Sequence, residues 1–123
     1  MKVSWNAVGP AALFLASGTM HFIKPEIFRA IVPPAFGHEA ELVAISGAAE
    51  VAGGIGLLVA PTRRAAAYGL TALLLAVWPA NWYMALTAER YAALAPAWAL
   101  WARVPLQVPL IWWVLSASRA DRR

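Results

Sequence analysis

Four long apolar runs, separated by short charged segments, constrain this chain more than any other feature. The longest run, residues 65–88, has no charged side chain over twenty-four residues. Runs at 5–23, 42–61 and 97–118 are of similar length, and each carries a single His, Glu or Arg. A helix needs about 20 apolar residues to cross a hydrocarbon core about 30 Å thick. The pattern therefore predicts an all-α fold, an integral membrane bundle of four transmembrane helices in a single domain over residues 1–123.

The composition argues against a soluble domain and against several kinds of site. The chain is 62% hydrophobic and 13% charged, whereas soluble domains carry about 25% charged residues. Its net charge of +4 suits a lipid bilayer, because basic residues gather at membrane boundaries. No basic stripe is interleaved with stacking aromatic residues, so we expect no nucleic-acid partner. With no cysteine and two histidines, we expect no disulfide, no thiol redox chemistry and no protein-built metal site.

The connector between the first two runs, residues 25–40, is amphipathic. Ile27, Phe28 and Ile31 recur at helical spacing, and Pro33-Pro34 interrupts the pattern. A short amphipathic helix of this kind lies in the membrane interface. We therefore expect a short interfacial helix between the first two spans, followed by a Pro-Pro turn, with Phe28 and Ile31 directed toward lipid or toward a pocket between the spans.

Polar side chains occur inside every predicted span and all lie toward the same leaflet. At about 1.5 Å rise per residue, Glu50 and Asn81 reach similar depths of about 10 to 12 Å below one boundary. Arg103 and Gln107 are four residues apart and share a helix face. A charged side chain at the centre of a span costs about 2.5 to 3.5 kcal/mol on insertion scales, so such residues indicate function by default. The set consists of His21, Glu50, Asn81, Arg103 and Gln107.

Two interpretations of this polar set are open from the residues alone. In the functional one, a polar pocket lies between the helices, His21 and Glu50 exchange protons as the catalytic pair, and the ligand is contacted by Asn81, Arg103, Gln107 and Trp82. In the structural one, Glu50 and Arg103 form a buried ion pair, and the remaining polar groups only complete its hydrogen bonding.

Six separated motifs resemble the DoxX-like family of small four-helix membrane proteins, in order and over nearly the whole chain. They are GTMHFIKP at 18–25, IVPP at 31–34, SGAAE at 46–50, PTRRAA at 61–66, PAN at 79–81 and RVPLQ at 103–107. The resemblance implies the four-helix membrane fold. It also implies an association with quinone-linked oxidation or with redox and detoxification partners, as in some members of that family.

The leading functional hypothesis is a redox-associated subunit or small enzyme that binds a hydrophobic small molecule between the helices, with a quinone as the candidate ligand. A quinone needs proton donors near its carbonyl groups, which a protonated carboxyl group supplies. A lipid or terpenoid isomerase or hydrolase would use the same acid and base without redox chemistry. A structural or assembly protein would use neither. A redox protein partner and a homo-oligomer are both compatible with the sequence.

The basic residues predict that both termini face the cytoplasm, in a multi-pass protein of a bacterial-type cytoplasmic (inner) membrane. The side with both termini and the second connector holds six basic residues, and the other side holds four, as the positive-inside rule requires. We expect a C-terminal fluorescent fusion to be bright and a C-terminal alkaline phosphatase fusion to be inactive. An active phosphatase fusion with a dark fluorescent one would reverse the orientation.

Overall fold

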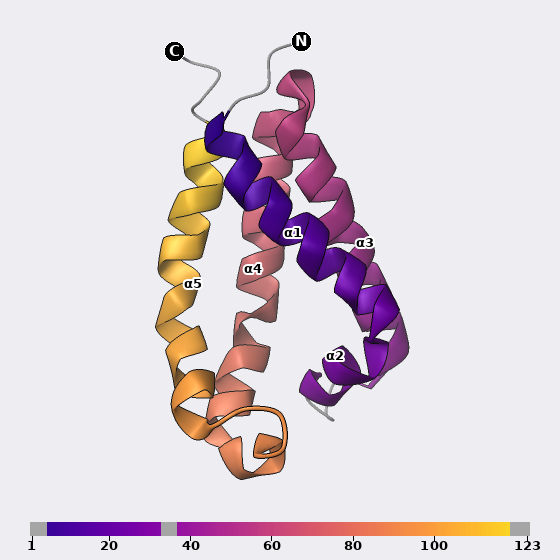
Figure 1. The fold of residues 1–123 in the computed structure, drawn as a ribbon, viewed down its shortest axis with the longest axis vertical. Helices are drawn as coiled ribbons and strands as arrows, with labels where there is room; N and C mark the ends of the chain where they lie inside the picture. The colour runs from indigo at the N-terminus through magenta and orange to yellow at the C-terminus, as the bar shows by residue number, and fades with distance from the viewer. Residues whose placement is uncertain (1–4, 33–36, 119–123) are drawn as a thin grey trace.

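The part of the chain that the structure describes folds into four long helices and three short ones (Figure 1). The computed structural model describes residues 5–32 and 37–118. In chain order the elements are α1 (Trp5–Ile23), α2 (Pro25–Ile31), α3 (Glu39–Leu58), the 3₁₀ helix η2 (Ala60–Thr62), α4 (Arg63–Leu86), the 3₁₀ helix η3 (Ala88–Tyr91) and α5 (Ala97–Ser118). No strand occurs among these residues, so the predicted all-α fold is confirmed.

The helix boundaries follow the apolar runs closely. The first and last runs coincide with α1 and α5, and the third run begins two residues after α4 begins. The second run was placed at 42–61, whereas α3 begins at Glu39. Glu39 and Glu41 occupy the first turn of α3, where negative charge is stabilised by the helix dipole. The charged residues that were assigned to the connector therefore belong to the helix.

Two of the described helical segments are long and apolar enough to cross a membrane. They are Glu39–Leu58, which is α3, and Ala60–Leu86, which joins η2 to α4. By the same criterion of length and hydropathy, α1 and α5 fall short. In α5, Arg103, Gln107 and two prolines lie within 22 residues and lower its hydropathy. The two-helix result is compatible with membrane association, and the four-span bundle stays a prediction.

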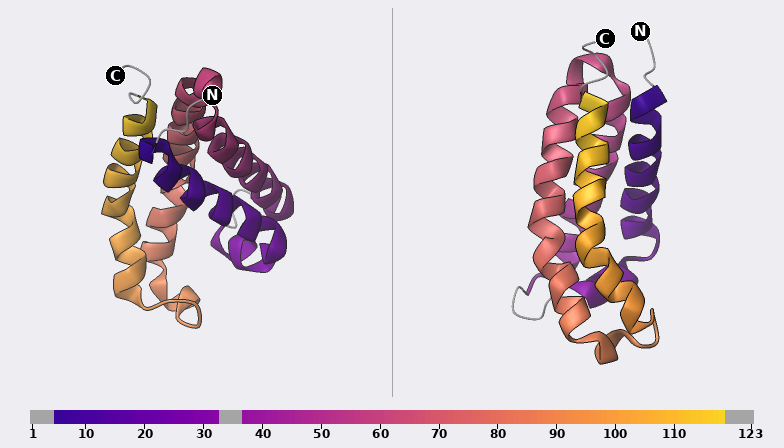
Figure 2. Two further views of the ribbon diagram at one scale, coloured as in Figure 1. Left: turned by 45° about the horizontal axis from the view of Figure 1, so that its top comes forward. Right: turned by 90° about the vertical axis from the view of Figure 1, so that its left-hand side faces the viewer.

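The long helices pack as two pairs that meet at one end of the bundle. α1 packs mainly against α3, α4 packs mainly against α5, and α3 joins the pairs through α4, whereas α1 and α5 make fewer contacts. The start of α1 and the end of α5 lie at the same end, beside η2 (Figures 1 and 2). From there α1 and α5 diverge toward the end that carries α2 and η3.

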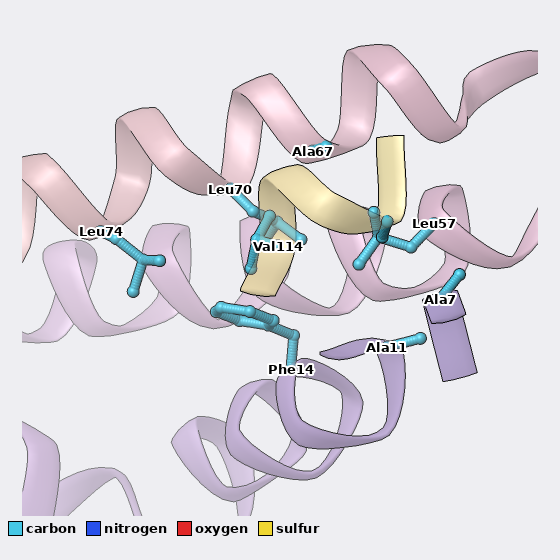
Figure 3. Packing of buried hydrophobic residues seen from close by; sticks show 9 residues of the cluster. Ala7, Ala11, Phe14, Leu57, Ala67, Leu70, Leu74 and Val114 are labelled. Atoms are coloured by element: carbon cyan, nitrogen blue, oxygen red, sulfur yellow. The ribbon is translucent and has the colours of Figure 1, made fainter. Parts of the chain in front are cut away.

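The apolar core fills the end where the two pairs meet. All four long helices contribute to it, and Phe14 of α1 lies close to Val114 of α5 (Figure 3). Its buried members are Ala7, Ala11, Phe14, Leu57, Ala67, Leu70, Leu74, Val114 and Ala117. A separate cluster of Met84, Tyr91 and Leu100 closes the far ends of α4 and α5 against η3.

Arg63 fixes the turn between α3 and α4. Its side chain is 2% exposed, and its Nε donates to the Leu57 carbonyl at 2.6 Å while Nη2 donates to the Leu58 carbonyl at 3.3 Å. These are carbonyls of the last turn of α3, which have no partner within the helix and carry the negative end of its dipole. Arg63 is one of the basic residues of the second connector, and its guanidinium group also caps α3.

Glycines allow α1 and α3 to cross with their backbones close together. A Cβ atom on Gly18 would lie 2.8 Å from the Gly47 carbonyl oxygen, and a Cβ on Gly47 would lie 2.6 Å from the Cβ of His21. Neither distance is sterically possible without a shift of the helices. Close backbone approach through small residues is a common mode of helix association in lipid.

We expect Gly47→Ala to destabilise the bundle by about 1 to 3 kcal/mol, because the new methyl group overpacks the crossing. The matched control is Gly69→Ala on α4, where an added Cβ meets no atom within 4 Å and the gain in helix propensity is about 0.5 to 1 kcal/mol. Thermal unfolding in a mild detergent, followed by circular dichroism, measures both. A Gly47→Ala variant as stable as Gly69→Ala would contradict the tight crossing.

Candidate functional site

The crossing of α1 and α3 brings His21 and Glu50 together. The Nε2 atom of His21 lies 3.1 Å from the Oε2 atom of Glu50, and both residues are 8% exposed. The sequence predicts that Glu50 lies within reach of at least one of four polar residues, and the structure confirms it with His21. No ion pair joins Glu50 to Arg103 within the described residues, so the ion pair of the structural interpretation is not formed.

The backbone carbonyl of Ser17 determines which ring nitrogen of His21 carries a proton when the ring is neutral. Nδ1 lies 2.7 Å from the backbone carbonyl oxygen of Ser17, one helical turn earlier. A carbonyl oxygen only accepts hydrogen bonds, so Nδ1 must carry a proton and donate it. In the neutral ring Nε2 is then an acceptor. The Ser17 side chain also lies beside the Glu50 carboxyl group.

One proton must therefore lie between Nε2 and Oε2. Without it, the nitrogen lone pair of His21 would face a carboxylate oxygen at 3.1 Å, and two acceptors do not form a hydrogen bond. The proton is either on the ring, which gives an imidazolium and a carboxylate, or on the carboxyl group, which donates to a neutral ring. In both forms the His21–Glu50 pair has no net charge and holds one transferable proton.

The short helix α2 covers this pair from the open end of the bundle. Phe28 stacks on the ring of His21 with 3.8 Å between ring centroids and 20° between ring planes. Pro25 begins α2, with Glu26 in its first turn and Arg29 in its last, as the helix dipole favours. The predicted helix in the connector is thus confirmed, and Phe28 points toward the pocket; the Pro-Pro turn and the Ile31 side chain lie outside the described part of the chain.

The His21–Glu50 pair lies in the wall of a cavity of about 500 Å³ between the long helices, here called the central cavity. Most of its lining is apolar, and Phe14 and Leu74 separate it from the core. The polar side chains that line it come from all four long helices: Ser17, His21, Ser46, Glu50, Asn81, Arg103 and Gln107. The structure therefore brings all five predicted intramembrane polar residues to one space.

Asn81 presents a side-chain amide to the central cavity without a partner from the described part of the protein. The residue is 7% exposed, and its amide forms no hydrogen bond with any residue that the structure describes. Because no described side-chain nitrogen or oxygen atom is both fully buried and unpaired, the amide is accessible from the cavity and open to a bound molecule. Pro79, two residues earlier in α4, lies on the exposed side of the helix and does not line the cavity.

Arg103 and Gln107 line the central cavity in different ways. The Gln107 amide donates a hydrogen bond from Nε2 to the Leu74 carbonyl oxygen and so ties α5 to α4. Arg103 forms no ion pair and no hydrogen bond with a described residue. Gln107 thus has a structural partner within the bundle, whereas Arg103 is exposed and presents a positive charge with no partner among the described residues.

Trp82 does not belong to the site. It was predicted to contact the ligand, but it does not line the central cavity and is 38% exposed. Its ring packs edge-on against Trp78 and Trp101, with ring centroids 5.9 and 6.1 Å apart. Trp82 follows Asn81 directly, and successive helix residues project about 100° apart, which accounts for their different surroundings.

The sequence did not single out two residues of the site. Ser17 orients His21, and the only signal for it is its position four residues earlier on the same helix face. Gly47 makes room for the His21 side chain, and in the sequence nothing distinguishes it from the other glycines of the run at 42–61. Neither role follows from residue type without the geometry of the helix crossing.

The model of a family described as a domain of unknown function (DUF8561) matches residues 11–118 of the chain. The matched range runs from within α1 to the end of α5 and includes every polar residue of the central cavity. No curated protein matches the chain. No solved structure matches it either.

We expect Glu50→Leu to cost about 1 to 3 kcal/mol in the free energy of unfolding, because Nε2 of His21 loses its buried partner. Glu50→Gln should cost less than about 1 kcal/mol, since its amide donates to the neutral ring in place of the shared proton. Thermal unfolding in detergent measures both. Glu26 is exposed, so Glu26→Leu serves as the control and should change the free energy of unfolding little. Equal losses for the Leu and Gln variants would contradict the hydrogen-bonded pair.

Proposed function

We propose that this chain, which belongs to the DUF8561 family, is an integral membrane protein of four membrane-spanning helices that binds a hydrophobic small molecule in its central cavity. The observation that carries the proposal is the amide of Asn81, which has no hydrogen-bond partner among the described residues and opens onto a cavity shared with the His21–Glu50 pair. An amide that only fixed the packing of the helices would bond to a neighbouring helix, as Gln107 does, whereas an amide that faces a mostly apolar cavity suits a binding site.

The surface of the bundle supports a membrane environment for all four long helices. Large apolar side chains are exposed on each of them, among them Phe22 of α1, Ile45 of α3, Leu75 of α4 and Trp112 of α5, at 54, 66, 55 and 64% exposure. An apolar surface of this extent is unfavourable in water and costs nothing in lipid. The proposal includes a bacterial-type inner membrane with both termini in the cytoplasm.

The size and chemistry of the central cavity support a small lipophilic ligand. Its volume of about 500 Å³ lies within the roughly 300 to 1,000 Å³ of small-molecule sites, which are mostly apolar with a few placed polar groups. A quinone is the first candidate, because its carbonyl oxygens take up protons on reduction and the His21–Glu50 pair holds one. The resemblance to the DoxX-like family suggests the same ligand class.

Proton transfer to a ligand also needs a route to water. His21 lines a second, smaller hollow of about 210 Å³ between α1, α2 and α3, in which Arg29 takes part. The imidazole thus stands between this hollow and the central cavity, with access to both. Its position supports the assignment of His21 and Glu50 as the proton-handling pair.

A lipid or terpenoid isomerase or hydrolase is the second candidate function. The same single proton between Nε2 and Oε2 favours it, since a neutral acid and base in one apolar cavity can protonate one atom of a substrate and deprotonate another. A structural or assembly protein would instead copurify with a protein partner and no cavity ligand.

Mass spectrometry of lipophilic molecules retained by the purified protein tests the proposal. We expect a bound molecule in the wild type and about tenfold less of it in Asn81→Leu, because a ligand hydrogen bond is lost. The same variant should be as stable as the wild type or more stable, since no hydrogen bond within the described protein is lost and a leucine adds apolar surface to a mostly apolar cavity. A quinone would support the redox assignment, and another lipid would support the isomerase or hydrolase.

The control variant is Leu75→Ala on the lipid-facing side of α4, which does not line the central cavity and should retain the ligand. A wild-type protein that carries no lipophilic molecule in any preparation would contradict the proposal. So would an Asn81→Leu variant that unfolds readily and retains its ligand, because that result assigns Asn81 to packing.

A further inference from the structure

We propose that the central cavity binds its ligand as an oxyanion, so that the ligand is an amphiphile with an acidic head, a carboxyl group or an acidic ring hydroxyl, paired with Arg103. This inference rests on the proposed function and adds the chemical class of the ligand. It restricts the quinone candidate to hydroxyquinones, whose acidic ring hydroxyl can ionise, and it makes neutral lipophiles, such as alcohols and ethers of the same size, the weaker ligands.

The first argument is the charge of the cavity lining. Three of its residues carry a charge or can acquire one near neutral pH: His21, Glu50 and Arg103. The His21–Glu50 pair holds one proton between Nε2 and Oε2 and therefore has no net charge. The carboxylate is thus compensated within its own pair. The lining carries one positive charge in excess, on Arg103.

The second argument is that nothing in the described protein neutralises this charge. Arg103 forms no ion pair or hydrogen bond with a described residue. It is exposed and also lines the central cavity from the first half of α5, so it lies where the cavity opens. A guanidinium group presents a rigid fork of N–H donors that matches two oxygens of one acidic group. An anionic head at this opening supplies the opposite charge and both acceptors.

The third argument is the position of Asn81 on the opposing helix α4. Its amide has no hydrogen-bond partner among the described residues and opens onto the same cavity. Its NH₂ group donates to an oxyanion, and its carbonyl accepts from any hydroxyl that remains on the head. Leu13, Phe14 and Leu110 line the apolar remainder, where the hydrocarbon part of such a molecule fits.

Matched pairs of ligands test the inference in the full-length protein in lipid nanodiscs. The first pair is dodecanoic acid and dodecanol, and the second is an alkyl hydroxynaphthoquinone and its methyl ether. By calorimetric titration we expect the acid of at least one pair to bind about tenfold more tightly than its neutral partner, as charge-assisted hydrogen bonds allow. The pair that shows the larger preference identifies the head, carboxylate or ring oxyanion.

Arginine variants assign the preference to its cause. Arg103→Gln should abolish the advantage of the acid, and Arg103→Lys should keep most of it because the charge remains. The matched control is Arg90→Gln in η3, whose guanidinium group bonds the Tyr83 hydroxyl and does not line the cavity; it should keep the full preference. If Arg103→Gln fails to fold, the ratio of the affinities of the wild type for the acid and for its neutral partner still tests the inference.

Two results overturn the inference. One is an equal affinity for the acid and its neutral partner in both pairs. That result contradicts recognition of an oxyanion and leaves the proposed function unaffected. The other is an acid preference that survives in a folded Arg103→Gln protein. Failure of all four probes to bind, together with the absence of any copurified lipophile, would remove the inference and the proposed function together.

Discussion

The close crossing of α1 and α3 is the contact on which the rest of the structure depends. Gly18 and Gly47 bring the two backbones to a distance that no side chain at either position would permit. His21 sits directly against Gly47, and only from there does its ring reach Glu50 on the next turn of α3. The chain then reverses into α2, whose Phe28 covers the ring. A wider crossing would separate the acid from its partner and uncover both.

The uneven packing of the two helix pairs explains why the cavity lies where it does. At the end with η2, small and medium side chains such as Ala7, Ala11 and Ala67 let all four helices meet in one core. Arg63 holds that end together by capping α3 at the point where α4 begins. Toward α2 and η3 the helices diverge, and the core gives way to a space lined by polar residues. Rigid packing at one end therefore supports an open site at the other.

Much of the fold and part of the site could be predicted from the sequence, because hydrophobicity and helix length are local properties. Helix positions agree to within three residues, and the five polar residues predicted inside the apolar runs share one cavity. The partner of Glu50 could not be chosen among four candidates, since that choice depends on the rotation of each helix about its axis. In a chain whose helices are apolar on every face, the sequence pattern carries little information about rotation.

The same limit explains what the sequence leaves out at Trp82 and Arg63. An aromatic residue beside Asn81 is a reasonable ligand contact by type, and its ring packs against Trp78 and Trp101, outside the central cavity. A basic residue after a proline-containing turn is typical of a membrane boundary, and Arg63 in addition folds back onto two carbonyls of α3. Both outcomes depend on side-chain direction, which the order of residue types does not encode.

The central cavity also makes the stability of this bundle a property that the chain shares with its surroundings. The helix pairs are held apart around about 500 Å³ of space, so a molecule that fills it replaces the contacts that direct packing would make. A ligand that binds only the folded chain raises the free energy of unfolding by RT ln(1 + [L]/Kd), about 2.7 kcal/mol at a hundredfold excess over Kd. The folded fraction of such a chain then rises and falls with the concentration of the ligand. Removal of the ligand lowers the stability of an unchanged polypeptide.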